Sequence, residues 1–194
     1  MKFKIYKYKN VTSTNDEAIF LIKQKQKKTG CVCAESQTKG RGTYGKKWVS
    51  NKGNLFSSIF FPLEKNYPSF SEFSIINPII IADMMMKFCE QKYIKFKFPN
   101  DIFLNGKKIC GLLQEHIHDK NKKFLIIGIG LNVVTNPQLN KNYKATNIFH
   151  ETRKKHSVDE IIKLIIDSYE NFFSKLNFYD YSYFKKKAER MSFN

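Results

Sequence analysis

Two periodicities of apolar side chains describe the first thirty residues. Residues 2–8 (KFKIYKY) alternate polar and apolar side chains, which predicts a half-buried strand. Residues 13–28 have helical spacing, which places one group of apolar side chains on a single face: Ala18, Leu21 and Ile22. Thr14 and Glu17 have the spacing of a capping box at the start of this helix, and Gly30 is expected to end it.

Short apolar runs bounded by turn residues predict the strands. Asn105 and Gly106 stand between two such runs and give the strongest short-range signal for a hairpin. The run at residues 124–134 is apolar enough for a central strand. The expected strands are residues 31–35, 55–61 before Pro62, 94–98 before Pro99, the two arms around 105–106, and 124–134 after a turn at 119–123.

Longer apolar stretches predict the remaining helices. The first contains Pro78, which is expected in its opening turns or at a kink. The second begins with Ser157 as its cap and Glu160 three residues later. The expected helices span residues 71–91, 157–176 and 180–190.

The order of these elements defines the fold class. Helices are mixed with a hairpin-rich set of strands, so we expect an α+β fold with a mixed, largely antiparallel sheet flanked by helices. Neither an internal repeat nor a linker interrupts residues 1–194, which are expected to form a single domain.

Composition and apolar runs limit the class of protein. The chain has 194 residues, of which 42% are hydrophobic and 15% aromatic, which favours a folded protein over a disordered one. The longest apolar run, residues 75–86, is too short to span a membrane and is interrupted by Asn77, Pro78 and Asp83. The first ten residues lack the apolar block of a signal peptide, so a cytoplasmic protein without membrane contact is expected.

A formal charge of +17 raises the question of a nucleic-acid partner. Only three of the 34 basic residues are arginines, at positions 41, 153 and 190, and the lysines are spread along the whole chain. A general lysine bias explains this distribution better than a dedicated basic surface does, although the functional surface stays the alternative.

The four cysteines and paired histidines offer little for a metal site. Without a secretory signal, the cysteines are expected to be free thiols. Cys31 and Cys33 alternate on a predicted strand, and this spacing suits burial on one face better than it suits the ligands of a zinc site. His116 and His118 also share a strand face, but no second pair of ligands accompanies them.

Residues 40–56 (GRGTYGKKWVSNKGNLF) form a glycine-rich loop that contains four of the nine glycines. Glycines so close together indicate a backbone that approaches another group. The start of the loop matches G-x-x-x-x-G-K, the phosphate-binding loop of nucleoside triphosphatases. Lys47 stands where that motif needs Ser or Thr, and no helix follows, so we reject this reading.

The side chains of the glycine-rich loop suggest a different ligand. Arg41, Lys46 and Lys47 are cations suited to phosphate, and the indole of Trp48 can stack on a heterocycle such as adenine. An ordinary flexible surface loop is the alternative that the spacing leaves open.

Two further motifs have chemistry of their own. Lys97 ends a predicted strand just before Pro99 and the Asn100-Asp101 pair, where its charge could reduce repulsion between two anions. A solvated edge-strand lysine is the alternative. The glycines in residues 128–133 (GIGLNV) indicate close approach by a backbone or a ligand, or simple strand packing.

Together these stretches resemble the biotin protein ligases. That family's pattern is matched by STN at 13–15, Gln37 with GRGTYGKKW, KFPND at 97–101, KICGLL at 108–113 and GIGLN at 128–132. The matches appear in family order and extend from residue 13 to residue 132. Each one alone is weak, whereas five in order are specific.

The resemblance implies a catalytic domain akin to class II aminoacyl-tRNA synthetases and lipoate ligases. It implies an enzyme that uses ATP with Mg²⁺ to convert biotin to biotinyl-5′-AMP. A lysine of a biotin carboxyl carrier protein, the domain that carries biotin in acetyl-CoA carboxylase, then receives the biotin. Metal ligands are not identified, and a homodimer is possible within the family.

The resemblance also implies roles for individual residues. Lys97 and Arg41 are the expected catalytic residues. The residues expected to bind biotin are Ser13, Thr14, Asn15, Gln37, Gly40, Arg41, Lys97 and Gly111. Those expected to bind ATP or the adenylate are Arg41, Gly42, Thr43, Tyr44, Gly45, Lys46, Trp48, Asn100 and Asn132.

The chain departs from the family pattern in three ways. Thr43 replaces a second arginine of the loop, and Phe98 replaces the tryptophan of K-W-P-N-D. The small C-terminal β-barrel and the N-terminal helix-turn-helix of many members are expected to be absent, so no specific DNA target is expected. Alternatives are a lipoate or octanoate protein ligase and a non-catalytic domain that binds biotin or nucleic acid.

Overall fold

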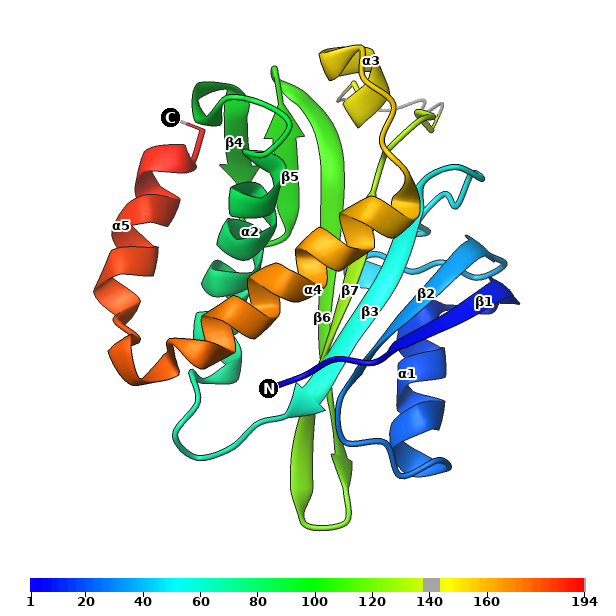
Figure 1. Ribbon diagram of the computed structural model, residues 1–194, viewed down its shortest axis with the longest axis vertical. Helices are drawn as coiled ribbons and strands as arrows, with labels where there is room; N and C mark the ends of the chain where they lie inside the picture. Colours follow the sequence, from blue (N-terminus) through cyan, green and yellow to red (C-terminus); the bar gives the residue numbers. More distant parts are fainter. Residues whose placement is uncertain (138–143, 194) are drawn as a thin grey trace.

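A single seven-stranded sheet organises the protein (Figure 1). The structure is a computed structural model that describes residues 1–137 and 144–193. The strand order is β1-β2-β3-β7-β6-β5-β4, in which only β1 and β2 run parallel. The strands are β1 Ile5–Val11, β2 Gly30–Gln37, β3 Leu55–Pro62, β4 Ile94–Lys97, β5 Asp101–Leu104, β6 Lys107–Asp119 and β7 Lys122–Leu131.

Helices lie on both faces of this sheet, so the expected α+β class is confirmed. The α-helices are α1 Thr14–Lys23, α2 Phe70–Met85, α3 Ile148–Thr152, α4 Val158–Ser174 and α5 Tyr181–Met191. Three short 3₁₀ helices cover Thr43–Gly45, Gln91–Tyr93 and Leu176–Phe178. In the part of the chain that the structure describes, none of the helices combines the length and apolarity needed to cross a membrane.

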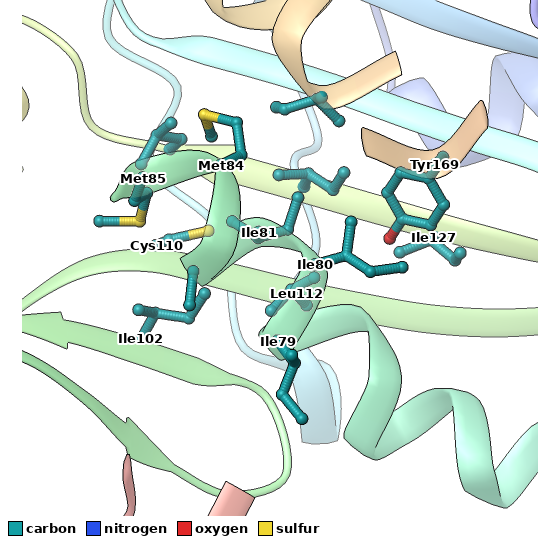
Figure 2. Packing of buried hydrophobic residues seen from close by; sticks show 14 of the residues in the cluster. Ile79, Ile80, Ile81, Met84, Met85, Ile102, Cys110, Leu112, Ile127 and Tyr169 are labelled. Carbon is teal, nitrogen blue, oxygen red and sulfur yellow. The ribbon is translucent and has the colours of Figure 1, made fainter. Parts of the chain in front are cut away.

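The larger core lies between the sheet and the layer of α2, α4 and α5. Figure 2 shows its centre, where isoleucines and methionines of α2 face strands β5 to β7 and Tyr169 of α4. The labelled side chains include Ile79, Ile80, Ile81, Met84, Met85, Ile102, Cys110, Leu112 and Ile127. Helix α4 crosses diagonally in front of β6 and β7 (Figure 1).

A smaller apolar cluster attaches α1 to the opposite face. Ala18, Leu21 and Ile22 pack there against Val32, Phe60, Phe124 and Ile126 of β2, β3 and β7. The predicted apolar face of the helix is therefore confirmed. Among the described helices, α1 is the one that packs on this side near β6 and β7, and the cavity lies beside it on the same face.

A buried chain of polar groups connects the helical layer to β6. The Tyr169 hydroxyl donates to the side-chain oxygen Oδ1 of Asn77 at 3.0 Å. The side-chain Nδ2 of Asn77 donates to Oε1 of Gln114 at 2.8 Å. The Gln114 amide then donates to the backbone oxygen of Phe70 at 2.6 Å. Since burial of an unpaired polar group is costly, these bonds fix α2 between α4 and the sheet.

Several predicted boundaries near the N-terminus were wrong. The first strand spans Ile5–Val11 instead of 2–8, and the first helix ends at Lys23 instead of residue 28, before the strand that Gly30 begins. The capping box of Thr14 and Glu17 does not form, because Ser13 is the N-cap and makes no side-chain cap bond. Strand β2 supplies the missing acceptor, since the side-chain oxygen Oε1 of Gln37 accepts a hydrogen bond from Thr14 N at 2.8 Å.

Predictions for the later elements were closer. Helix α2 stops at Met85 instead of residue 91, and Pro78 lies in its middle instead of its first turns. Its start has a capping box between Ser69 and Glu72 that the sequence reading overlooked. The Asn105-Gly106 hairpin is confirmed, with positive φ at both residues, as is the Ser157 cap of α4.

Candidate active site

A cavity of about 670 Å³ lies on the sheet face that α1 covers. Most of its wall comes from segments far apart in sequence: the start of α1, the glycine-rich loop, the link between β4 and β5, the first half of β6 and the end of β7. These segments contain the five motifs quoted above. The volume suits a small molecule of the size of a nucleotide with a further group attached.

Two glycines make space for the indole of Trp48 in this cavity. Gly111 on β6 is paired directly with Gly130 on β7. A Cβ atom built on Gly130 would lie 2.3 Å from the indole ring, and one on Gly111 would lie 2.6 Å from it. The indole Nε1 is buried without a partner among the described residues, and a Cβ on Gly130 would lie 2.6 Å from it, so this edge of the ring faces β7.

The glycines of residues 128–133 therefore do permit a close approach, as the sequence predicts. The approaching groups are side chains and not a backbone, since a Cβ on Gly128 would lie 2.6 Å from the Asn15 side chain. Gly128 and Gly130 thus accommodate two different motifs of the chain on one strand face.

Arg41 lies at the cavity wall between two carboxylates. Its guanidinium forms ion pairs with Asp16 through Nη1 and with Glu115 through Nη2, the latter at 2.8 Å. Burial lowers the pKa of Arg41, but the hydrogen bonds to both carboxylates outweigh burial and raise it. The guanidinium therefore stays charged at every pH at which the protein is folded.

Polar residues of α1, β2 and β3 form a network beside Arg41. Ser58 Oγ donates to the Asn15 carbonyl oxygen and lies 2.8 Å from Thr14 Oγ1. The Asn15 amide donates to Glu115 at 2.6 Å. The amide of Gln37 donates to Ser50 at 3.1 Å. The residues predicted to bind biotin in this region, Ser13, Thr14, Asn15 and Gln37, all line the cavity, and the side chains of the last three bond to other protein groups.

Two lysines line the cavity in different environments. Lys97, the predicted catalytic lysine, is exposed at the end of β4. Lys108 of β6 has a side chain only 13% exposed, with Nζ 2.7 Å from Asp101 and 5.4 Å from the centre of the Trp48 ring. Its charge is thus held more deeply in the wall than that of Lys97.

The sequence reading missed Lys108 because of a β-bulge. In simple alternation, Lys108 would face away from Gly111, on the side of the apolar core. Ile102 pairs with Cys110 and Phe103 pairs with Lys108, so Ile109 is an extra residue that turns Lys108 toward the cavity. No pattern in the sequence marks the bulge, although KKICGLL was already recognised as a motif.

The glycine-rich loop contributes most of its predicted residues. Gly42, Thr43, Tyr44, Lys46, Lys47 and Trp48 line the cavity. Thr43, which replaces the family arginine, accepts a hydrogen bond from Asn100 at 3.2 Å and so links the loop to the KFPND segment. Tyr44 is 89% exposed at the tip of the loop.

Two predicted residues do not contribute to the cavity wall. Gly40 is not part of the lining, and a Cβ there would lie 2.7 Å from the backbone oxygen of Trp48. Gly45 is also outside the lining and adopts a left-handed conformation with φ +70°. Their glycine identity therefore serves the shape of the loop. Asn132 does line the cavity, and its amide donates to Thr146 O at 2.9 Å.

Thiols and imidazoles lie apart from this chemistry. All four cysteines are free, and burial raises the pKa of Cys33 to about 11. The rings of His116 and His118 are 5.9 Å apart. Among the described residues, no group of three His, Cys, Asp or Glu side chains has the arrangement of a metal site. Asp101 is the one carboxylate in the described part of the cavity wall.

Comparison with known proteins gives a consistent set of relatives. The sequence model of the biotin/lipoate A/B protein ligase family matches residues 7–132. The bifunctional ligase/repressor BirA of Escherichia coli is 32% identical over 125 residues, which cover 63% of this chain and 38% of BirA. The biotin–[acetyl-CoA-carboxylase] ligase of Paracoccus denitrificans is 28% identical over 127 residues, covering 64% and 52%. The chain thus matches about two fifths to one half of the length of these curated relatives.

Solved structures extend the similarity over the whole fold. A biotin protein ligase from Leishmania major in complex with biotin has a TM-score of 0.87 at 26% identity, with 98% of this chain and 82% of that chain covered. The biotin protein ligase from Aquifex aeolicus in complex with biotin and ATP has a TM-score of 0.77 at 26% identity, covering 97% and 78%.

Proposed function

The chain belongs to the biotin/lipoate A/B protein ligase family, and from this premise we propose that it is an ATP-dependent biotin protein ligase. Its substrates are biotin, ATP and a lysine of a biotin carboxyl carrier protein. One observation carries the proposal: the five ordered motifs, distant in sequence, line one cavity of about 670 Å³. The relatives named as biotin ligases support the choice of biotin over lipoate.

The proposed reaction has two steps. A carboxylate oxygen of biotin attacks the α-phosphorus of ATP, the bond from that phosphorus to the bridging oxygen breaks, and pyrophosphate leaves. The amine of the carrier lysine then attacks the acyl carbon of biotinyl-5′-AMP. An amide forms, the amine loses a proton, and AMP leaves with the electron pair of the broken bond.

Cations in the wall address the main electrostatic problem of the first step. A carboxylate and a phosphate repel each other until positive charge is placed between them. Lys108 has the more favourable position, because its ammonium is largely withdrawn from water and oriented by Asp101. Lys97 adds a cation at the exposed rim of the same cavity. We therefore assign both lysines to the neutralisation of negative charge, Lys108 deep in the cavity wall and Lys97 at its rim.

The loop residues are suited to holding the intermediate. Arg41 keeps its positive charge and can donate further N–H groups to the carboxylate or phosphate. The indole of Trp48 offers a flat apolar surface for adenine or the biotin ring. A covering loop excludes water, which would otherwise hydrolyse the mixed anhydride.

Magnesium enters this scheme with ATP. The ion commonly binds substrate phosphates with one or two protein carboxylates and several waters. Asp101 is the one carboxylate among the described residues of the wall, and its ion pair with Lys108 at 2.7 Å already engages it. The described wall therefore does not fit a metal ion held by protein carboxylates, and we assign no magnesium ligand.

Pyrophosphate release separates this proposal from its alternatives. Wild-type protein is mixed with ATP and magnesium, and with biotin, lipoate, octanoate or no acid. Release that needs biotin, followed by biotin transfer to a carrier domain but not to its Lys-to-Arg variant, supports the proposal. Preference for lipoate or octanoate would reassign the substrate. A folded protein that binds biotin by calorimetry and releases no pyrophosphate would overturn the catalytic function.

A further inference from the structure

Asp16 and Glu115 hold Arg41, although neither carboxylate belongs to the cavity wall. Asp16 lies in the first turn of α1, and Glu115 lies on β6, two residues beyond Leu113. Together they attach the beginning of the glycine-rich loop to α1, which packs on the sheet, and to β6, which is a strand of the sheet. Neither residue is among the functional residues expected from the sequence.

The Glu115 carboxylate also connects to the far end of the loop. It accepts from the Asn15 amide at 2.6 Å, and Asn15 is linked through Ser58 to Thr14. Thr14 N donates to the Gln37 carbonyl oxygen at 2.8 Å, and the Gln37 amide donates to Ser50 at 3.1 Å. Hydrogen bonds thus run from Arg41 to Ser50 beneath the segment that contains Trp48.

We propose that Asp16 and Glu115 are positioning residues that keep loop residues 41–50 closed over the cavity by holding Arg41. This inference rests on the proposed function, in which the loop retains biotinyl-5′-AMP until the carrier lysine arrives. Loss of the two carboxylates then frees the loop and lets the intermediate escape or hydrolyse. Neither residue contacts the reacting atoms.

The geometry of the guanidinium explains how holding and binding are compatible. Arginine offers five N–H donors in a fixed plane. Each carboxylate takes a donor from a different terminal nitrogen, and among the described residues these two bonds leave Nε and the second hydrogen of each terminal nitrogen for a ligand. A carboxylate or phosphate of the substrate can therefore meet an arginine whose direction is already set.

The ion pairs are partly exposed, which makes the closed loop sensitive to salt. The side chains of Arg41, Asp16 and Glu115 are 37%, 40% and 33% exposed. Pairs of this exposure are screened by ions and shift an equilibrium by about twofold to fivefold each. High ionic strength is therefore expected to act in the same direction as removal of the carboxylates.

Trp48 reports the position of the loop without any need for catalysis, because it is the only tryptophan. Acrylamide quenching of its fluorescence is compared in wild type, Asp16→Asn, Glu115→Gln and the double variant. We expect stronger quenching in each variant, and a rise with sodium chloride in wild type that the double variant lacks. Quenching that is equal in all proteins, or equally salt-sensitive in the double variant, would overturn the inference.

Glu170→Gln is the matched control for these variants. Glu170 also accepts two hydrogen bonds, from Lys2 Nζ and Phe3 N, but it belongs to α4 in the helical layer. We expect this change to leave Trp48 quenching as in wild type. Urea unfolding of all variants shows whether any change in quenching follows global stability, which would also count against a specific role in holding the loop.

The ratio of pyrophosphate released to biotin transferred tests the functional part. We expect this ratio to rise about twofold to fivefold in each single variant, because the intermediate then escapes more often before the carrier lysine reacts with it. An unchanged ratio beside active wild type would refute the inference and leave the ligase proposal intact. Absence of biotin-dependent release from wild type would instead refute the ligase proposal, while the quenching data would still decide whether the carboxylates hold the loop.

Discussion

Gly111 and Gly130 face each other across β6 and β7, and the indole of Trp48 occupies the space that their missing side chains leave. The pairing explains why each of these two strands has a glycine at this position. Each glycine belongs to a different motif, and each one is needed by a third motif in the loop.

Gly130→Ala is expected to displace the Trp48 ring, because the new Cβ atom would lie 2.3 Å from it. Overpacking of this kind costs about 1–3 kcal/mol. Urea unfolding should show that loss, and the emission of Trp48 should move to longer wavelength. Gly42→Ala is the control, since its nearest neighbour lies at 3.4 Å, and its stability should match wild type. Equal stability of both variants would contradict the packing argument.

Lys108→Ala is expected to slow biotin-dependent pyrophosphate release more than Lys97→Ala does. Removal of a preorganised charge from a water-excluded site costs about 10²–10³ in rate, whereas an exposed rim cation contributes roughly tenfold or less. The measurement is pyrophosphate release at saturating ATP and biotin. Lys108→Arg, which keeps the charge, serves as the folding control. A larger effect at Lys97 would support the assignment made from the sequence.

Tyr169→Phe is expected to destabilise the protein without altering its activity. The change removes the hydroxyl that donates to Asn77 at 3.0 Å in a fully buried position and leaves that acceptor unpaired. Such a loss costs about 1–3 kcal/mol, which urea unfolding can measure. Tyr183→Phe, at a side chain that is 56% exposed, should leave stability unchanged. A neutral result for Tyr169 would show that Asn77 finds another donor.

Glu151 should contribute to stability at neutral pH and not in acid. Burial raises the pKa of this carboxyl, but bonds from Thr146, Asn105 and Lys107 outweigh burial and lower it below its ordinary 4.5. Because the folded-state pKa is depressed, the contribution is complete above pH 4.5 and disappears as pH falls through the lower folded value. Unfolding free energies of wild type and Glu151→Gln should differ at pH 7 and converge near the acid limit of folding. A constant difference would exclude this linkage.

Local patterns predicted much of the fold. Helical spacing identified the α1 face of Ala18, Leu21 and Ile22, and the Asn105-Gly106 pair identified its hairpin. These features depend on neighbouring residues only, so they can be read along the chain. The family resemblance, and not a local pattern, gave most of the predicted residues that line the cavity, among them Trp48, and their roles stay predictions.

The missed features depend on contacts between distant residues. The backbone N–H of Thr14, at the start of α1, donates to the side chain of Gln37 on β2, and no rule for helix starts includes such a contact. Lys108 turns toward the cavity only because Ile109 is an extra residue opposite β5. Glu115 lies outside every recognised motif, and its importance follows from its position beside Arg41. Each case required the register of the sheet.

The sheet separates the residues that form the larger core from those that line the cavity. Most of the apolar core packs beneath α2, α4 and α5, whereas the cavity lies on the other face with α1 and the loop. Adjacent residues of one strand therefore have different surroundings, as Gln114 does in the helical layer and Glu115 beside the loop. We therefore expect substitutions on the cavity face to change ligand binding while the packing of the larger core is kept.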